Sequence, residues 1–144
     1  MTIAHAHYKE DLKTEEENHG RNHPHVAIIR NNLGRVQKAQ GNTKGAILNF
    51  QTALEIDEEV YGPNHPSVAL RSFILADMFH DLGGLRDAKS LYKRALEIVE
   101  KNHGANHPDV AVLSSKLVPF HEKFLAFSIW LRTLLSAFLF LQII

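Results

Sequence analysis

The stretch GRNHPHVA at residues 20–27 decides the fold, because it returns as GPNHPSVA at residues 62–69 and as GANHPDVA at residues 104–111. The first and second copies begin 42 residues apart, as do the second and third. Between the copies the same register holds, with Leu33, Gly41, Ala46, Phe50 and 53–56 matching Leu75, Gly83, Ala88, Tyr92 and 95–98. Agreement over so many positions identifies an internal repeat, which is the signature of a solenoid or a similar array.

The register extends beyond the outer copies. Residues 4, 8 and 12 match 46, 50 and 54, and Leu117 matches Leu75, after which the pattern stops at Val118 and Pro119. The sequence therefore predicts the second helix of a truncated repeat over 1–20, whole repeats over 21–62 and 63–104, the start of a further repeat over 105–118, and an apolar tail over 119–144. Two complete units with open ends predict marginal stability, because such arrays gain stability from every unit and interface.

Proline and glycine divide each repeat into two helices. One proline per copy suits the first helical position, where its fixed φ and missing N–H are tolerated: Pro24, Pro66 and Pro108. One glycine per copy is placed to end the preceding helix in the left-handed conformation: Gly20, Gly62 and Gly104. Residues 40–43 and 82–85 suit tight helix–helix turns, and the Thr43 hydroxyl is expected to cap the helix that follows.

The second helix of each repeat carries one apolar stripe. Its residues lie at i, i+4, i+7 and i+8, as Ala46, Phe50, Ala53 and Leu54 and again as Ala88, Tyr92, Ala95 and Leu96. Small and aromatic side chains alternate along the stripe, so neighbouring helices can approach closely and interlock. No segment shows strand-like alternation, and the predicted fold class is all-α.

A family resemblance rests on Leu33-Gly34, Gly41, Ala46, Phe50 and Ala53, a pattern that resembles the tetratricopeptide repeat (TPR). The 42-residue spacing and the His-Pro-x-Val-Ala turn are similar to those of kinesin light chains, and similar arrays follow nucleotide-switch domains in microbial and innate-immune-type proteins. The resemblance implies a right-handed solenoid of antiparallel helix pairs whose first helices line a concave peptide-binding surface. It does not imply kinesin membership, because the heptad-rich joining segment is missing and the repeats are few.

The last copy departs from this pattern at Pro119. A proline inside a helix removes one hydrogen bond and clashes with the preceding turn. We therefore expect the first helix of the last, incomplete repeat to break or kink early.

The candidate binding residues lie on the first helices of the two whole repeats. They are expected to line the concave face beside Ile28, Leu70, His80 and Asp81, and they are Asn31, Asn32, Arg35, Lys38, Phe73 and Asp77. Their amide and cationic groups suit an acidic or extended peptide, through hydrogen bonds to its backbone and carboxylates. The alternative is that Arg35 pairs with its counterpart Asp77 in an exposed ion pair worth about 0–1 kcal/mol.

Composition excludes several other functions. With 16 Lys+Arg against 16 Asp+Glu, the net charge is zero, so the chain lacks the field that nucleic-acid binders use. The absence of cysteine excludes thiol chemistry and fits a reducing compartment. Residues 1–20 are polar and do not resemble a secretory signal. Ser114 and Ser115 lack a neighbouring base, and no phosphate-binding loop is found, so we expect neither an enzyme nor a cofactor.

The ten histidines raise a metal hypothesis, which the sequence does not favour. His19, His23 and His25, like His103 and His107, straddle a glycine turn and so do not lie on one helical face. His23, His65 and His107 recur once per repeat, too far apart to share an ion. We interpret them as turn-packing residues before a helix-starting proline and predict no metal site.

The tail from Phe124 to Ile144 has 21 residues and a single charge, Arg132. Its length would let a helix span a bilayer, but Arg132 opposes insertion by about 2.5–3.5 kcal/mol. Three interpretations stay open: a membrane anchor, a cap or partner helix for the last repeat, and a segment that is a gene-boundary or splicing artefact.

The function that the sequence favours is a cytoplasmic protein–protein interaction scaffold that binds a peptide or helix on the concave face. One alternative is a tail-anchored membrane adaptor facing the cytosol, oriented by Lys116, Lys123, Trp130 and Arg132, in which the repeats are a spacer. Another is a sensor fragment of a nucleotide-switch protein. The expected partner is another protein, through a peptide or helix, and not a nucleic acid. A membrane contact through residues 124–144 and an oligomer both stay open.

Overall fold

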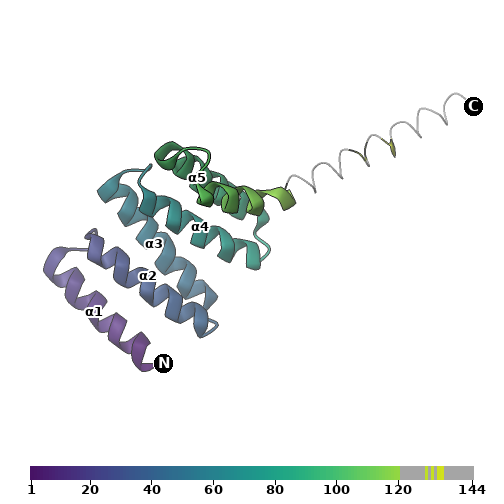
Figure 1. Cartoon of the computed structure of the whole chain (residues 1–144). Coiled ribbons are helices and arrows are strands. Elements are labelled where there is room, and N and C mark those ends of the chain that lie inside the picture. The colour runs from purple at the N-terminus through teal and green to yellow at the C-terminus, as the bar shows by residue number, and fades with distance from the viewer. Residues whose placement is uncertain (121–128, 130, 132, 135–144) are drawn as a thin grey trace, which may run out of the picture.

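The fold is an array of antiparallel helices, seen in a computed structural model of the chain (Figure 1). The structure describes residues 1–120 and, beyond them, Ile129, Leu131, Thr133 and Leu134. Its helices are α1 (Ile3–His19), α2 (Pro24–Ala39), α3 (Thr43–Tyr61), α4 (Pro66–Asp81) and α5 (Leu85–His103), followed by a helix over residues 108–120. Each bound of α4 and α5 lies 42 residues beyond the same bound of α2 and α3, so the repeat fixes the backbone. The all-α helix-pair solenoid is confirmed.

The histidine of each repeated phrase begins a helix. His23, His65 and His107 have their Nδ1 atoms 3.4, 3.2 and 3.3 Å from the backbone N–H two residues on, which donates to them. A side-chain acceptor at this position satisfies an N–H that lacks a partner within the helix. The following proline, first in the helix, needs no partner because it has no N–H. The phrase Asn-His-Pro is therefore a helix start, as its turn-packing interpretation requires.

Glycine ends the helices, with one difference from expectation. Gly20 and Gly62 have φ of 84° and 87°, a sign of φ that favours glycine, but their ψ values of 166° and 162° lie outside the left-handed helical region. The cap prediction at Thr43 is also wrong. Asn42 is the capping residue, and its side chain accepts a hydrogen bond from the Gly45 N–H, whereas Thr43 is already the first residue of α3.

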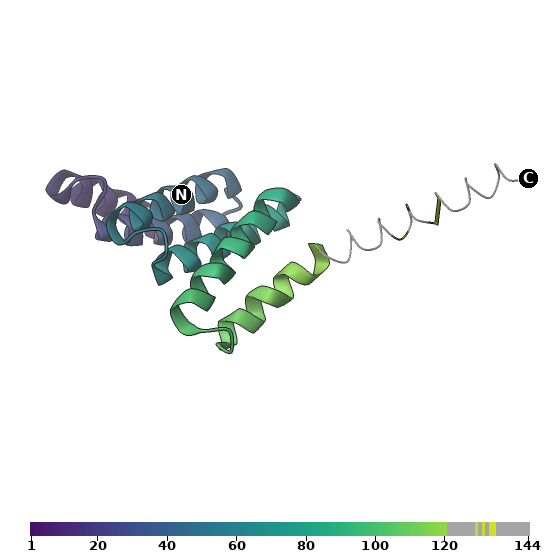
Figure 2. The same cartoon turned by 90° about the horizontal axis from the view of Figure 1, so that it is seen from above.

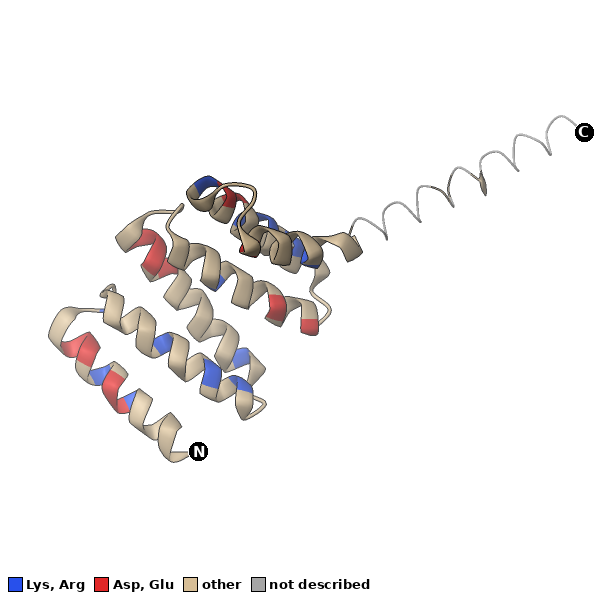
Figure 3. Ribbon diagram, in the orientation of Figure 1, with Lys and Arg blue, Asp and Glu red and all other residues tan. Residues whose placement is uncertain are grey.

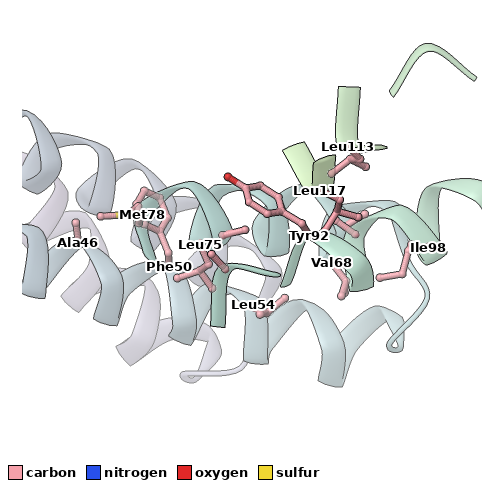
Figure 4. Packing of buried hydrophobic residues seen from close by; sticks show 14 residues of the cluster. Ala46, Phe50, Leu54, Val68, Leu75, Met78, Tyr92, Ile98, Leu113 and Leu117 are labelled. Carbon is pink, nitrogen blue, oxygen red and sulfur yellow. The ribbon is translucent and has the colours of Figure 1, made fainter. Parts of the chain in front are cut away.

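The core lies between consecutive helices, each packed on the next along the chain. The stripe predicted on the second helices forms its centre: Ala46, Phe50, Ala88, Tyr92 and Ala95 are all at most 1% exposed. Figure 4 shows Phe50 beside Met78 at one end of the main cluster and Tyr92 beside Leu117 at the other. Alanines opposite aromatic rings allow the close helix approach that the pattern predicts.

The helix over residues 108–120 packs beside α5 (Figure 2). It remains helical through Pro119 to Phe120, so within the described residues the helix does not break at this proline, and a kink there stays a prediction. Leu113 and Leu117 are 4% and 6% exposed in the main cluster. Their burial stabilises the helix and offsets the one backbone hydrogen bond that Pro119 cannot donate.

The tail falls largely outside the described residues. The interpretations of residues 124–144, including the role given to Trp130 and Arg132, concern that part of the chain. Among the described residues, no helix combines the length and the hydropathy needed to cross a bilayer.

Candidate protein-binding face

The first helices of successive repeats present equivalent stripes, which together we call the first-helix face. Each stripe takes positions i, i+3, i+7 and i+10 of its helix, and these positions share one side of a helix. On α2 they are Ile28, Asn31, Arg35 and Lys38, on α4 Leu70, Phe73, Asp77 and His80, and on the helix of residues 108–120 they begin with Val112 and Ser115.

An apolar column crosses this face near the start of each helix. Ile28, Leu70 and Val112 occupy the same repeat position and are 52%, 58% and 50% exposed. Scattered exposed apolar residues need no explanation, but these three recur in register on the first helices of successive repeats, and Leu70 and Val112 line the same hollow.

A hollow of about 240 Å³ opens beside this column. Leu70, Phe73, Val112 and Leu113 line it from the first helices, and Ile98, Val99, Asn102 and His103 line it from α5, with Pro66, Ala69 and Asp109 completing the wall. Most of this lining is apolar, which is typical of a pocket that receives a side chain.

The equivalent place one repeat earlier holds an ion pair. There Asp57 and Arg71 occupy the repeat positions that Val99 and Leu113 hold at the hollow. The Arg71 Nε atom lies 2.6 Å from Asp57 Oδ2. These two residues are only 2% and 8% exposed. The two junctions thus carry a buried ion pair in one repeat and apolar side chains in the next.

A polar cluster lies farther along the face, around Asp77. Lys116 Nζ lies 2.8 Å from Asp77 Oδ1, and the Tyr92 hydroxyl donates a hydrogen bond to the same oxygen. The ammonium group also lies over two rings, 5.6 Å from the centroid of Phe73 and 6.0 Å from that of Tyr92. Such cation–π contacts add to the ion pair, so Lys116 is held in place.

The pKa values in this cluster are shifted by its geometry. Burial raises the pKa of Asp77, but the hydrogen bonds from Lys116 and Tyr92, together with the charges of Lys116 and Lys38, outweigh it and leave the pKa below the ordinary 3.8. Burial and the hydrogen bond to the Asp77 carboxylate raise the pKa of the Tyr92 hydroxyl. Asp77 is thus a carboxylate, and Tyr92 a donor, at neutral pH.

The suggested Arg35–Asp77 pair does not form, because Lys116 takes that carboxylate. Arg35 and Lys38 are exposed and make no ion pair with any described residue. Figure 3 shows basic segments on α2 and acidic segments near the end of α4 on the same side of the molecule. The α2 part of the face thus keeps two cations available to a ligand.

The six predicted residues divide into two groups. Phe73 and Asp77, both half-buried, meet through Lys116, whereas Asn31, Asn32, Arg35 and Lys38 follow α2, from which the charge of Lys38 acts on Asp77. The Asn31 Oδ1 atom is shielded from solvent and has no described partner. Two further residues of the face were not predicted. Val112 follows from the 42-residue register, whereas Lys116 does not, because its counterpart in the preceding repeat is Ile74.

The histidines of the first turn lie closer together than their spacing suggests. The Nδ1 atoms of His19, His23 and His25 lie 3.1, 3.2 and 3.2 Å from Glu15 Oε1. The glycine turn that was expected to separate them instead folds the start of α2 back over the end of α1.

Helix pairs with a fixed repeat, a small-and-aromatic core and an exposed first-helix face define a helical-repeat interaction module. The family described as "Tetratricopeptide repeat" matches residues 2–59 and 46–101. The chain belongs to this family, and the prediction of a TPR array with a 42-residue repeat is confirmed. TPR arrays are in general protein–protein interaction modules and typically non-catalytic, so the chain carries an interaction scaffold whose partner is another protein.

A solved structure with the same fold is described as "Crystal structure of BtubC (BKLC) from P. vanneervenii". It is 24% identical, with a TM-score of 0.72 over 78% of this chain, and the chain spans 45% of its length. At this identity the likeness shows the fold. No curated protein matches the sequence.

Proposed function

We propose that the chain is an adaptor that binds a peptide or helix of a partner protein on the first-helix face. The observation that carries the proposal is the exposed column of Ile28, Leu70 and Val112. Leu70 and Val112 also line the hollow between α4, α5 and the helix of residues 108–120. The partner segment places apolar side chains on this column and one of them in the hollow.

Charge sets the second part of the specificity. Arg35 and Lys38 supply cations without described ion-pair partners, and Asn31 and Asn32 supply amides that hydrogen-bond a peptide backbone. On α4, Asp77 occupies the repeat position of Arg35, and its charge is already neutralised by Lys116. The face therefore suits a segment that carries apolar anchors for the column and an acidic residue for Arg35 and Lys38. The absence of cysteine supports a cytoplasmic location for this adaptor.

The test uses peptides selected against the full chain from a random displayed library. The affinity of a selected peptide is measured by fluorescence anisotropy for the wild type and for two variants. Leu70→Glu with Val112→Glu places charges on the column, and Asn32→Ala with Arg35→Ala removes polar contacts. We expect at least about a tenfold loss for the first pair, because truncating central anchors of an interface typically costs 2 kcal/mol or more.

The chain offers a matched control on α3. Leu48 is 62% exposed on α3, a second helix, and the next repeat has Ser90 at its position. Leu48→Ser should leave both the peptide affinity and the helical circular dichroism unchanged. Selected peptides that bind the column variants as tightly as the wild type would exclude this face.

A further inference from the structure

The first turn brings three histidines around one carboxylate, an arrangement that neither later turn has. Glu15 Oε1 lies at its centre, 3.1–3.2 Å from the Nδ1 atoms of His19, His23 and His25. The ligand atoms of Glu15, His23 and His25 all lie within 4.8 Å of one another. We propose that this turn binds a single zinc-like transition-metal ion through the three imidazoles and the carboxylate.

The distances from the carboxylate to the three imidazoles fit such an ion. Zinc bonds to imidazole nitrogen and carboxylate oxygen are about 2.0–2.2 Å, so the edges of a tetrahedron of ligands are roughly 3.3 Å long. The three Nδ1–Oε1 separations are already close to this length. The side chains of His19 and His25 are 51% and 67% exposed, so an ion has access and the rings have room to turn toward it. Three nitrogen donors and one oxygen donor suit zinc better than calcium or magnesium.

The charges also point to a bound cation. Glu15 is the counterpart of Asp57, which is neutralised by Arg71, but the counterpart of Arg71 in the first repeat is Ile29. The nearby Arg30 is paired with Glu16, 2.6 Å away. Within the described residues, the ion pairs of Glu15 are with histidines alone, and its Oε1 atom is shielded from water without a hydrogen-bond partner.

His23 shows why a cation is needed between these atoms. Its Nδ1 atom accepts the backbone N–H of His25 at 3.4 Å and so presents a lone pair, not a hydrogen, in the neutral ring. The same atom lies 3.2 Å from a carboxylate oxygen. Two acceptors at this distance repel each other unless a proton or a metal ion lies between them. A bound metal would take the Nδ1 lone pair that now accepts the His25 N–H. This hydrogen bond is the longest of the three equivalent histidine caps.

The later turns provide internal controls, because each carries other residues at the same positions. Glu15, His19, His23 and His25 become Asp57, Tyr61, His65 and Ser67 in the second turn and Val99, His103, His107 and Asp109 in the third. In the second turn, Tyr61 stacks on His65 with their ring centroids 4.5 Å apart. Exchanging residues between turns therefore changes the ligand set while keeping side chains that this backbone already accommodates.

The experiment titrates zinc chloride into the full chain, purified without a histidine tag, and follows heat by calorimetry and the melting temperature by circular dichroism. We expect one ion per chain, a raised melting temperature, and no response to magnesium chloride. Cobalt chloride should give the strong visible absorption of a tetrahedral complex.

Three variants locate the site. His19→Tyr with His25→Ser installs the residues of the second turn, and Glu15→Gln removes the carboxylate. Each should weaken zinc binding at least about tenfold, because even partners outside the first coordination sphere typically contribute 10–100-fold. His103→Tyr, the matched change in the third turn, should leave the affinity unchanged.

The proposal is overturned if zinc does not bind at one ion per chain, or if it binds the first two variants as tightly as the wild type. It is also overturned if His103→Tyr weakens binding as much as they do. A first-turn variant that fails to fold is replaced by His25→Ser alone, whose side chain lies outside the core and whose counterpart is Ser67.

Discussion

The junction between α3 and α4 and the junction between α5 and the helix of residues 108–120 share a backbone and have opposite interiors. In the first, Asp57 and Arg71 form a buried ion pair; in the second, Val99 and Leu113 leave an apolar hollow. The helix bounds and the glycine φ angles of 87° and 83° are nearly the same in both. The repeat thus specifies the path of the chain, and a few side chains at fixed positions decide what each junction can bind.

The largest effect is expected from removing one member of the buried Asp57–Arg71 ion pair. Arg71→Leu leaves the Asp57 carboxylate buried without its partner, and removing one member of a buried pair typically costs about 3–5 kcal/mol. We expect the free energy of unfolding, measured by urea denaturation of the full chain, to fall by that amount. For an array of few repeats, this loss is a large part of the total stability.

The double variant Asp57→Val with Arg71→Leu sharpens the comparison, because it installs the pair that the later junction carries. Replacing a buried ion pair by apolar residues is often neutral or stabilising by about 1–4 kcal/mol. Stability should therefore return to the wild-type value or exceed it. A single variant as stable as the wild type, or a double variant less stable than the single, would show that the two junctions are not interchangeable.

A second contrast lies inside the helix pairs. Between α2 and α3, Asn49 Nδ2 donates to Gln37 Oε1 at 2.8 Å, and both residues are nearly buried. The counterparts in α4 and α5 are Phe79 and Leu91, which pack on the main apolar cluster. The same two positions thus hold a polar contact in one repeat and an apolar one in the next.

Asn49→Leu tests this contrast with a smaller expected effect. The change leaves the buried Gln37 carbonyl without its donor, which typically costs about 1–3 kcal/mol. Thermal and urea denaturation measure the loss. Adding Gln37→Phe, so that both positions match the second pair, should recover most of it, whereas a further loss in the double variant would mean that the first pair has no room for the ring.

The sequence predicts the fold better than the site, for a physical reason. Helix ends follow from single residues such as Pro66 and Gly62, whose backbone preferences act locally. Asn42 and Thr43 both have capping side chains, and only the backbone decides between them. Pro119 has a local preference too, but burial of the adjacent Leu117 overrides it.

The candidate sites depend on contacts between distant residues. Lys116 reaches Asp77 across 39 positions of sequence, from a repeat position that is apolar in the preceding copy. The cluster around Glu15 depends on how closely a glycine turn folds two helices together, which spacing along one helix does not show. Such contacts follow from the register only where the residue types repeat, as they do for Ile28, Leu70 and Val112.

The smallest expected effect concerns one difference between the apolar stripes of α5 and α3, the hydroxyl group of Tyr92. Tyr92 donates a hydrogen bond to Asp77, whereas its counterpart Phe50 has no hydroxyl and faces no such carboxylate. Tyr92→Phe should lower the free energy of unfolding by about 1 kcal/mol at neutral pH, the usual net contribution of one hydrogen bond. Phe50→Leu serves as a comparison, since it changes packing alone and its cost should not depend on pH.

The pH dependence identifies this hydrogen bond as the cause. Because the pKa of Asp77 is lower in the folded chain than its ordinary 3.8, its ionised form stabilises the fold above that value, and this contribution is lost as the pH falls through the folded-state pKa. Tyr92→Phe removes one of the groups that lower the pKa, while Lys116 and Lys38 still act on it. The stability difference between wild type and variant should therefore be constant between about pH 5 and pH 9, where neither Asp77 nor Tyr92 titrates, and shrink below the ordinary pKa of the carboxyl. A difference that stays constant down to the acid transition would mean that the hydroxyl acts through packing and not through the Asp77 carboxylate.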